Sequence, residues 1–75
     1  MGIRVFENRD RLLAQGFHVV EVPWNQGWLA GMNPVDSWCQ QHLQGEYDVR
    51  MHRSRQLTGF FRSDADAMLF KLKWS

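Results

Sequence analysis

The sequence predicts a small α+β domain: an antiparallel sheet with helices on one face, in the order β-α-β-β-α. Three patterns predict it. Apolar residues recur at helical spacing over 34–43, apolar and polar residues alternate over 46–53, and Ser63 precedes a second helical run. The 75 residues make one domain, 1–75, near the lower size limit at which a chain can bury a core of its own.

The first sixteen residues predict a short strand and a short helix. Residues 3–6 are mostly apolar and indicate the strand. Asn8 is a favoured N-cap, so we expect a helix from there through Gln15, and Gly16 supplies its stop signal.

Residues 17–22 predict a longer strand. Phe17 and Val19 point to one side of it, and Val20 and Val22 point to the other, so both faces are largely apolar. A strand of this kind is usually central in its sheet and covered above and below. The proline that follows ends it, because proline cannot donate a hydrogen bond to the ladder.

The clearest helix is predicted over 34–43. Asn33 is its expected N-cap, Pro34 occupies the first helical position, and Gly45 lies just beyond the end. One apolar stripe runs along it, made of Val35, Trp38, Cys39, His42 and Leu43. We expect this stripe to pack on the sheet.

Residues 46–53 and 56–62 predict a β-hairpin. In its first strand apolar and polar residues alternate, which is typical of a strand with one buried face. The expected outward face of the hairpin carries Asp48, Arg50, His52, Thr58, Phe60 and Arg62.

A terminal helix is predicted from Ser63, its expected N-cap, to about Leu69 or Phe70, and the sequence leaves open whether the residues after it continue the helix. Asp66 stands three residues on, in the capping-box position, and Asp64 favours the positive end of the helix dipole. At about 100° per residue this helix has two apolar faces. One carries Ala65, Met68, Leu69 and Leu72, and the opposite one carries Ala67, Phe70 and Trp74. Two such faces predict a helix that is packed on both sides or one that binds a partner.

Residues 70–74 leave a second possibility open. Their apolar and lysine side chains also alternate with period two, as those of a final strand would. With that extra terminal strand the fold would be ferredoxin-like, of the split β-α-β type.

Composition limits the classes of function. A net charge of +1 is too small for a generic binder of nucleic-acid backbones. No run of about eighteen apolar residues predicts a membrane span, and no apolar N-terminal segment predicts a signal peptide. We therefore expect a cytoplasmic protein that does not bind membranes.

The sequence predicts no catalytic residues, no cofactor and no metal site. Cys39 and His42 stand three residues apart on the apolar stripe, and His18 and His52 are the other histidines. Structural zinc sites usually show paired cysteine or histidine spacings, and a mid-helix cysteine among apolar residues is typical of core packing. No nucleophile motif or phosphate-binding loop occurs, so we do not expect an enzyme.

The C-terminal half resembles a group of short, functionally uncharacterised proteins encoded by bacteriophages. The resemblance lies in a D-A-x-x-F-K-L-x-W ending, here 66–74, and in an aromatic-rich strand before it, here 58–62. A Trp-Cys pair at 38–39 and Gly-Glu-Tyr at 45–47 also fit. The resemblance implies a phage-encoded protein that binds host machinery or virion components in the cytoplasm of a bacterial host. It supplies no catalytic residues.

An excess of aromatic residues predicts an interaction module. Ten aromatic side chains, four of them tryptophan, are more than so short a chain usually needs for its core. Because Trp and Arg dominate interface energetics, we expect a host or virion protein to bind an aromatic patch rimmed by arginines. The expected patch consists of Trp24, Trp28, Phe60 and Trp74, with Arg50, Arg53, Arg55 and Arg62.

Two alternatives stay open. One is a nucleic-acid-binding module in which Phe60, on the basic face of the hairpin, stacks on a base. The other is a self-associating structural component whose two-faced terminal helix is buried in a homo-oligomer. For Trp24 and Trp28 the alternative role is core packing, the commoner fate of tryptophan in small domains.

Overall fold

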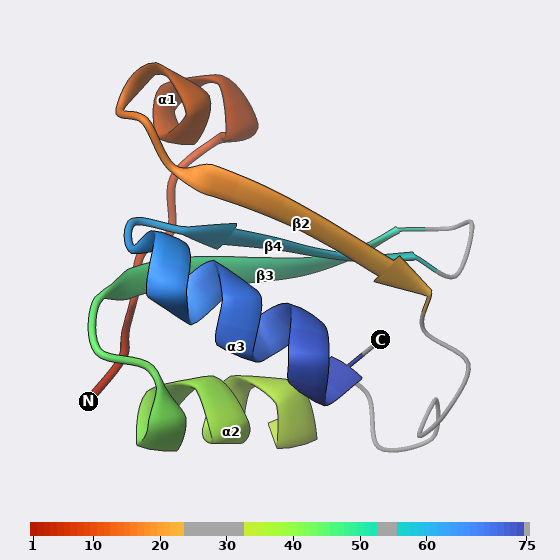
Figure 1. Cartoon of the computed structure of the whole chain (residues 1–75). Helices are drawn as coiled ribbons and strands as arrows, with labels where there is room; N and C mark the ends of the chain where they lie inside the picture. The colour runs from red at the N-terminus through yellow and green to blue at the C-terminus, as the bar shows by residue number, and fades with distance from the viewer. Residues whose placement is uncertain (24–32, 53–55, 75) are drawn as a thin grey trace.

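In the residues that the structure describes, four strands form one mixed sheet in the order β1-β3-β4-β2 (Figure 1). The computed structural model describes residues 1–23, 33–52 and 56–74. Its elements, in chain order, are β1 (Ile3–Arg4), α1 (Arg9–Ala14), β2 (His18–Pro23), α2 (Asn33–His42), β3 (Glu46–His52), β4 (Gln56–Phe61) and α3 (Asp64–Trp74). The fold is α+β, as the sequence predicts, and the predicted order β-α-β-β-α runs from β2 to α3.

The sheet is not purely antiparallel. β3 and β4 pair antiparallel, which confirms the predicted hairpin, and β4 also pairs antiparallel with β2. β1 instead pairs parallel with β3, through Ile3 and Arg4. β2 and β3 therefore run parallel to each other with β4 between them, so that β2, α2 and β3 form a split β-α-β unit.

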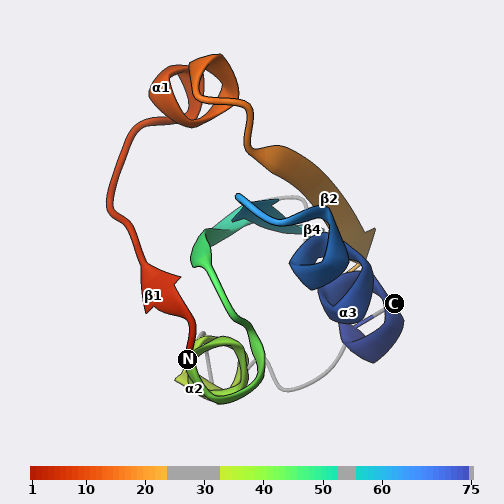
Figure 2. The same ribbon diagram turned by 60° about the vertical axis from the view of Figure 1, so that its left-hand side comes forward.

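Helices cover both faces of this sheet. α2 and α3 lie next to each other over one face, whereas α1 lies over the other, near the start of β2 (Figure 1 and Figure 2). The main core, under α2 and α3, consists of Val22, Val35, Cys39, Leu43, Tyr47, Val49, Leu57, Phe61, Ala67 and Phe70. A smaller cluster under α1 consists of Leu12, Phe17 and Phe60. The two helices of the predicted unit thus share one face, and α1 adds a cover for the other.

α2 packs on the sheet through most of its predicted stripe. Val35, Cys39 and Leu43 are buried, and Trp38 is half-buried against the main core. His42 is exposed instead, with its ring 5.2 Å from that of Trp38. The buried stripe is therefore one residue narrower than its apolar pattern predicts.

Aromatic rings join α3 to the sheet. The ring centroids of Phe70 and Phe61 lie 4.8 Å apart, and Trp38 meets Phe70 edge to face at 6.4 Å. Gly59 leaves room for this arrangement, because a Cβ there would lie 2.5 Å from the Phe61 ring and 3.3 Å from the Phe70 ring. A side chain at this position would force the rings to shift in a closely packed core.

β2 is an edge strand, and its predicted central position is wrong. Among the described strands it pairs with β4 alone. Both of its faces are nevertheless covered. Val20 and Val22 pack in the main core, and Phe17 and Val19 pack in the cluster under α1. The apolar character of both faces reflects helices above and below the strand, not neighbouring strands on both edges.

The predicted cap signals are confirmed at two helix starts. Asn8 Oδ1 accepts a hydrogen bond from the Arg11 N–H at 2.8 Å, and Ser63 Oγ accepts one from the Asp66 N–H at 3.4 Å. Gly16 follows α1 with a φ of 86°, a left-handed conformation that glycine adopts without steric cost.

Asp66 does not complete the predicted capping box. Its side chain is buried, and its carboxylate accepts hydrogen bonds from the backbone N–H groups of Gln44 and Gly45 at 3.0–3.2 Å. In a capping box this carboxylate would turn back to the start of its own helix. It instead joins the first turn of α3 to the connection between α2 and β3.

α3 continues as a helix through Trp74, so the alternative of a final strand over 70–74 is wrong. The sheet of the described residues therefore lacks the extra strand of a ferredoxin-like fold. Phe70 and Trp74 lie one helical turn apart, and the rings of both contact Trp38. In a strand, Phe70 and Trp74 would be too far apart for both to contact the same ring. None of the helices in the described ranges is long and apolar enough to cross a membrane.

We predict that Asp66→Ala lowers the free energy of unfolding by about 3 kcal/mol, because it leaves two backbone N–H groups without their charged acceptor. Asp64→Ala is the matched control in the same helical turn. Its side chain is exposed, so it should lose only a helix-dipole interaction of about 0.5 kcal/mol. Urea unfolding followed by tryptophan fluorescence measures both. Equal losses in the two variants would contradict the role of Asp66.

Candidate interaction surface

α3 presents one apolar face to the core and another to solvent. Ala67 and Phe70 are buried, and Trp74 is half-buried. On the opposite side Leu72 is 78% exposed, Met68 60% and Leu69 44%. We call this second surface the outer face of α3, and it is made of Ala65, Met68, Leu69 and Leu72.

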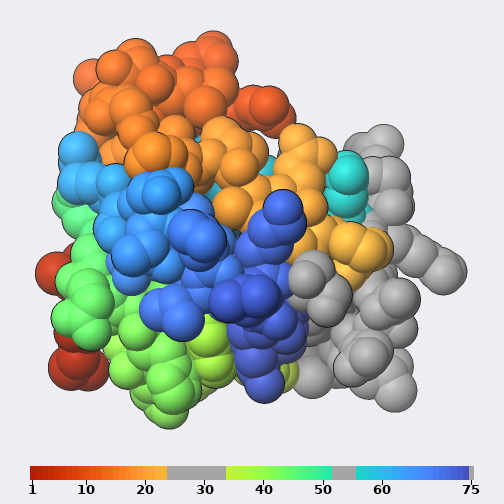
Figure 3. Space-filling model, viewed as in Figure 1, coloured from red at the N-terminus to blue at the C-terminus, as the bar shows by residue number. Residues whose placement is uncertain are grey.

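The outer face of α3 is a narrow apolar stripe with charged rims. Figure 3 shows α3 at the surface of the molecule, below β2 and above α2 in this view. At about 100° per residue, the four apolar residues span about 100° of the helix circumference. Lys73 lies on one side of this stripe, and Asp64 and Lys71 lie on the other.

Two contacts determine which side of α3 faces outward. Phe70 packs on Phe61 in the core, and Asp66 binds the backbone of Gln44 and Gly45. Both residues lie on the same side of the helix, so the outer residues cannot turn inward unless both contacts break. The exposure of the outer face is therefore a consequence of the packing of α3.

The described residues do not assemble the predicted aromatic patch. Phe60 is only 1% exposed, because Leu12 and Phe17 pack against it under α1, so its predicted place on an exposed hairpin face is wrong. Trp74 lies on the opposite face of the sheet, half-buried and 6.1 Å from the ring of Trp38. Four further members of the predicted patch lie outside the described residues: Trp24, Trp28, Arg53 and Arg55.

Arg62 is exposed, as predicted, but it binds groups of its own chain. Its Nε donates to Glu46 Oε1 at 2.6 Å and its Nη2 donates to Gln15 Oε1 at 3.1 Å. The guanidinium also lies 4.6 Å from the centroid of the Phe17 ring. Arg62 thus connects the end of β4 with the start of β3 and with the residue after α1.

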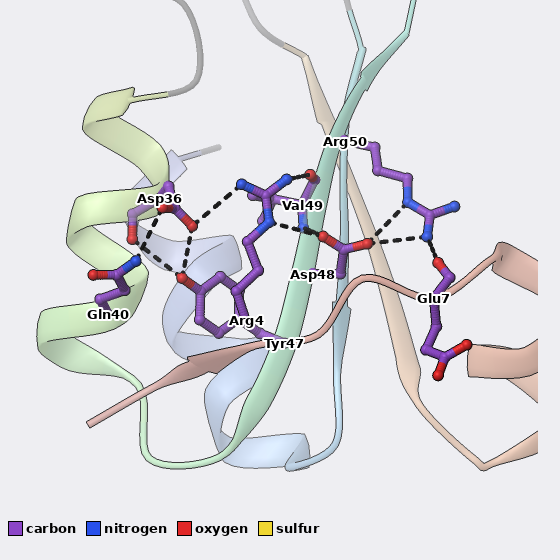
Figure 4. A network of polar contacts seen from close by, with 8 residues as sticks. All are labelled: Arg4, Glu7, Asp36, Gln40, Tyr47, Asp48, Val49 and Arg50. Atoms are coloured by element: carbon purple, nitrogen blue, oxygen red, sulfur yellow. Dashed lines mark hydrogen bonds and ion pairs between the residues drawn. The ribbon is translucent and has the colours of Figure 1, made fainter.

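Arg50 takes part in a network of charges around the buried Asp48 (Figure 4). Asp48 accepts hydrogen bonds from Arg4 Nε at 3.0 Å and from Arg50 Nε at 3.1 Å. Arg50 also donates to the backbone oxygen of Glu7 and lies 5.2 Å from the centroid of the Phe60 ring. The face that the sequence predicts to be solvated at Asp48 is therefore covered, in part by the segment between β1 and α1.

The same network connects β1 with α2 and with the edge of β3. Arg4 Nη2 donates to the Val49 carbonyl oxygen at 3.1 Å, and Arg4 Nη1 lies 3.5 Å from an oxygen of Asp36. The Tyr47 hydroxyl donates to the same carboxylate at 2.7 Å. Two arginines are thus balanced by two aspartates, so this region offers little net positive charge to a polyanion.

Cys39 lies in the core and is not an exposed nucleophile. Burial raises the pKa of its thiol to about 12, and the nearby Asp36 carboxylate adds to the rise. Such a thiol stays protonated near pH 7, whereas the thiolate is the form that attacks and binds metals. In the described part of the chain, no three His, Cys, Asp or Glu side chains are grouped as metal ligands.

Aromatic composition does not point to the outer face of α3, because that face contains no aromatic residue. The sequence signal that indicates this face is the pair of apolar faces over 64–74, because a helix that packs on a single core needs only one apolar side. The pattern alone does not tell which side is buried. The rings of Phe61 and Phe70 decide that in the folded chain.

We predict that Phe60→Ala lowers the free energy of unfolding by about 3–5 kcal/mol, because it leaves a cavity in the cluster under α1. Leu72→Ala should change the free energy of unfolding by less than about 0.5 kcal/mol, because Leu72 is mostly exposed and because leucine and alanine both favour helix. Urea unfolding of both variants checks this. A Phe60→Ala variant as stable as the wild type would show that this ring is not part of the core.

Stability should fall at high pH. Burial raises the pKa of Cys39 from 9.0 to about 12. Burial and a hydrogen bond to Asp36 raise the pKa of Tyr47 above its ordinary 10.0. The unfolded chain therefore loses both protons at lower pH than the folded chain does, and the contribution of these groups is complete below about pH 9 and lost as the pH rises toward 12.

The pH dependence is measured by urea unfolding in steps from about pH 8 to about pH 11. Cys39→Val removes one of the two groups and should make the decline above about pH 9 less steep, whatever its effect at neutral pH. A free energy of unfolding that stays constant over this range would contradict the assignment.

Comparisons of this chain with models of protein families, with curated proteins and with solved structures give no match. The features that bear on its function are therefore its own: the exposed outer face of α3, the arginines that are balanced within the chain, and the buried thiol of Cys39.

Proposed function

We propose that this protein is a small interaction module that binds another protein through the outer face of α3. The observation that supports this is the exposure of Met68 and Leu72, at 60% and 78%, on a helix whose other side already fills the core. A row of exposed apolar side chains costs free energy in water, and burial against a partner removes that cost.

The spacing of the outer face matches a common mode of recognition. Ala65, Met68, Leu69 and Leu72 stand at positions i, i+3, i+4 and i+7. Amphipathic helices that dock on other proteins present their anchors at this spacing. Because α3 is already ordered by the core, binding does not have to order the helix first.

The positions of the cations favour a protein partner over a nucleic acid. Arg50 binds Asp48, and Arg62 binds Glu46. Phe60, the ring that a stacked base would need, is buried under α1. The basic hairpin face with an exposed aromatic ring, on which the nucleic-acid alternative depends, is therefore not present in the described residues.

Three kinds of partner fit the outer face of α3: a host protein, a virion protein and a second copy of this chain. The resemblance to phage-encoded proteins favours the first two. The arrangement of charge and side-chain size along α3 favours the third, because it is complementary to itself.

A photo-crosslinking amino acid in place of Leu72 should give a defined covalent adduct in bacterial cells that express the chain, because position 72 would lie in the interface. The matched control is the same replacement of Leu13, a helical leucine that is 42% exposed on α1. Mass spectrometry of the adduct identifies the partner. No adduct at position 72, or equal adducts at both positions, would contradict the proposal.

A further inference from the structure

The outer face of α3 is complementary to itself. Its apolar residues are placed symmetrically about the midpoint between Met68 and Leu69, with Ala65 before it and Leu72 after it. We propose that this face packs against the same face of a second copy of the chain, with the two α3 helices antiparallel across a two-fold axis. The inference rests on the proposed function and names its partner.

Antiparallel packing about that midpoint matches large residues to small ones. Residues equally far before and after the midpoint come to the same height, so Ala65 of one copy faces Leu72 of the other. The two-fold axis repeats this contact. Met68 then meets Met68 of the second copy on one side, and Leu69 meets its own counterpart on the other side. The small Ala65 leaves space for Leu72, the most exposed of the large residues on this face.

The charged rim is complementary in the same arrangement. Asp64 and Lys71 lie on the same side of the stripe, about 20° apart around the helix axis. In an antiparallel pair each side of the stripe meets the same side of the second copy. Along the helix axis, Asp64 of one copy and Lys71 of the other then differ in height by about 3 Å. Two pairs of opposite charge therefore form across the interface. Both side chains are exposed in the single chain, with Asp64 4.0 Å from His18.

A parallel arrangement lacks these pairs. In it, the side of the stripe with Asp64 would meet the side with Lys73 of the second copy, and these residues would differ in height by about 13 Å. The two helix dipoles would also point the same way, whereas antiparallel helices bring opposite ends together.

The size of the face predicts a weak dimer. Three large apolar side chains per copy provide less than the roughly 800 Å² per partner of a standard stable interface. The main core is buried within one chain, so folding does not depend on the partner. We therefore expect a reversible dimer whose population rises with protein concentration.

Sedimentation equilibrium of the full chain, from about 10 µM to about 1 mM, tests the dimer. The wild type should move from the mass of one chain toward that of two. Leu72→Lys should remain at one chain, because it places a charge against Ala65 of the second copy, within the apolar interface. Leu13→Lys, on the opposite side of the sheet, is the matched control and should associate as the wild type does. Circular dichroism verifies that each variant is folded.

Exchange of the charge pair tests the antiparallel arrangement. Asp64→Lys and Lys71→Asp should each weaken self-association by about tenfold, because each brings like charges together twice. In a one-to-one mixture of the two variants both pairs are opposite in charge again. The mixture should therefore associate about as strongly as the wild type.

A wild type that stays at one chain at about 1 mM would refute the dimer, and so would self-association that Leu72→Lys leaves unchanged. A mixture that associates no better than either charge variant alone would refute the antiparallel arrangement. The proposed function fails separately, when position 72 forms no adduct with any protein. An adduct with a different protein, together with a strictly single chain, would keep the function and remove the dimer.

Discussion

The rotation of α3 about its own axis determines what this protein presents to a partner. Phe70 packs on Phe61, where Gly59 leaves room for the rings, and the carboxylate of Asp66 binds the backbone between α2 and β3. These contacts lie on one side of the helix. With both in place, the large side chains on the other side, such as Leu72, have no position in the core. The exposed apolar face is thus required by the way in which α3 is packed.

Charges within the domain fix the path of its N-terminal segment. β1 is only two residues long and pairs with the start of β3. The Arg4 side chain adds a contact further along β3, because it donates a hydrogen bond to the carbonyl oxygen of Val49. Asp48 joins Arg4 to Arg50, which in turn binds the backbone of Glu7. Desolvation offsets much of the attraction in such ion pairs, so they add little net stability. Their contacts join β1 and the segment between β1 and α1 to β3. Arginines that could rim an interface are used for this purpose.

The surface that remains for a partner is aliphatic, and this changes the kind of partner that fits. Aromatic and arginine side chains bind as isolated anchors in pockets. Methionine and leucine at helical spacing instead interlock with the side chains of another helix. Such packing needs a surface of the same period and of complementary size. The same helix, turned end for end, provides both, because Ala65 and Leu72 lie equally far from the midpoint of its outer face, between Met68 and Leu69.

The sequence by itself determined much of the local structure, including the N-caps at Asn8 and Ser63, the hairpin and most of the buried stripe of α2. These depend on residues a few positions apart, whose spacing is visible in the sequence. The tertiary structure alone decided that β2 lies at an edge, that Phe60 is buried, that Asp66 binds another element, and which face of α3 is exposed. The physical reason is that apolar spacing shows which side chains favour burial, whereas the element that covers them comes from a distant part of the chain.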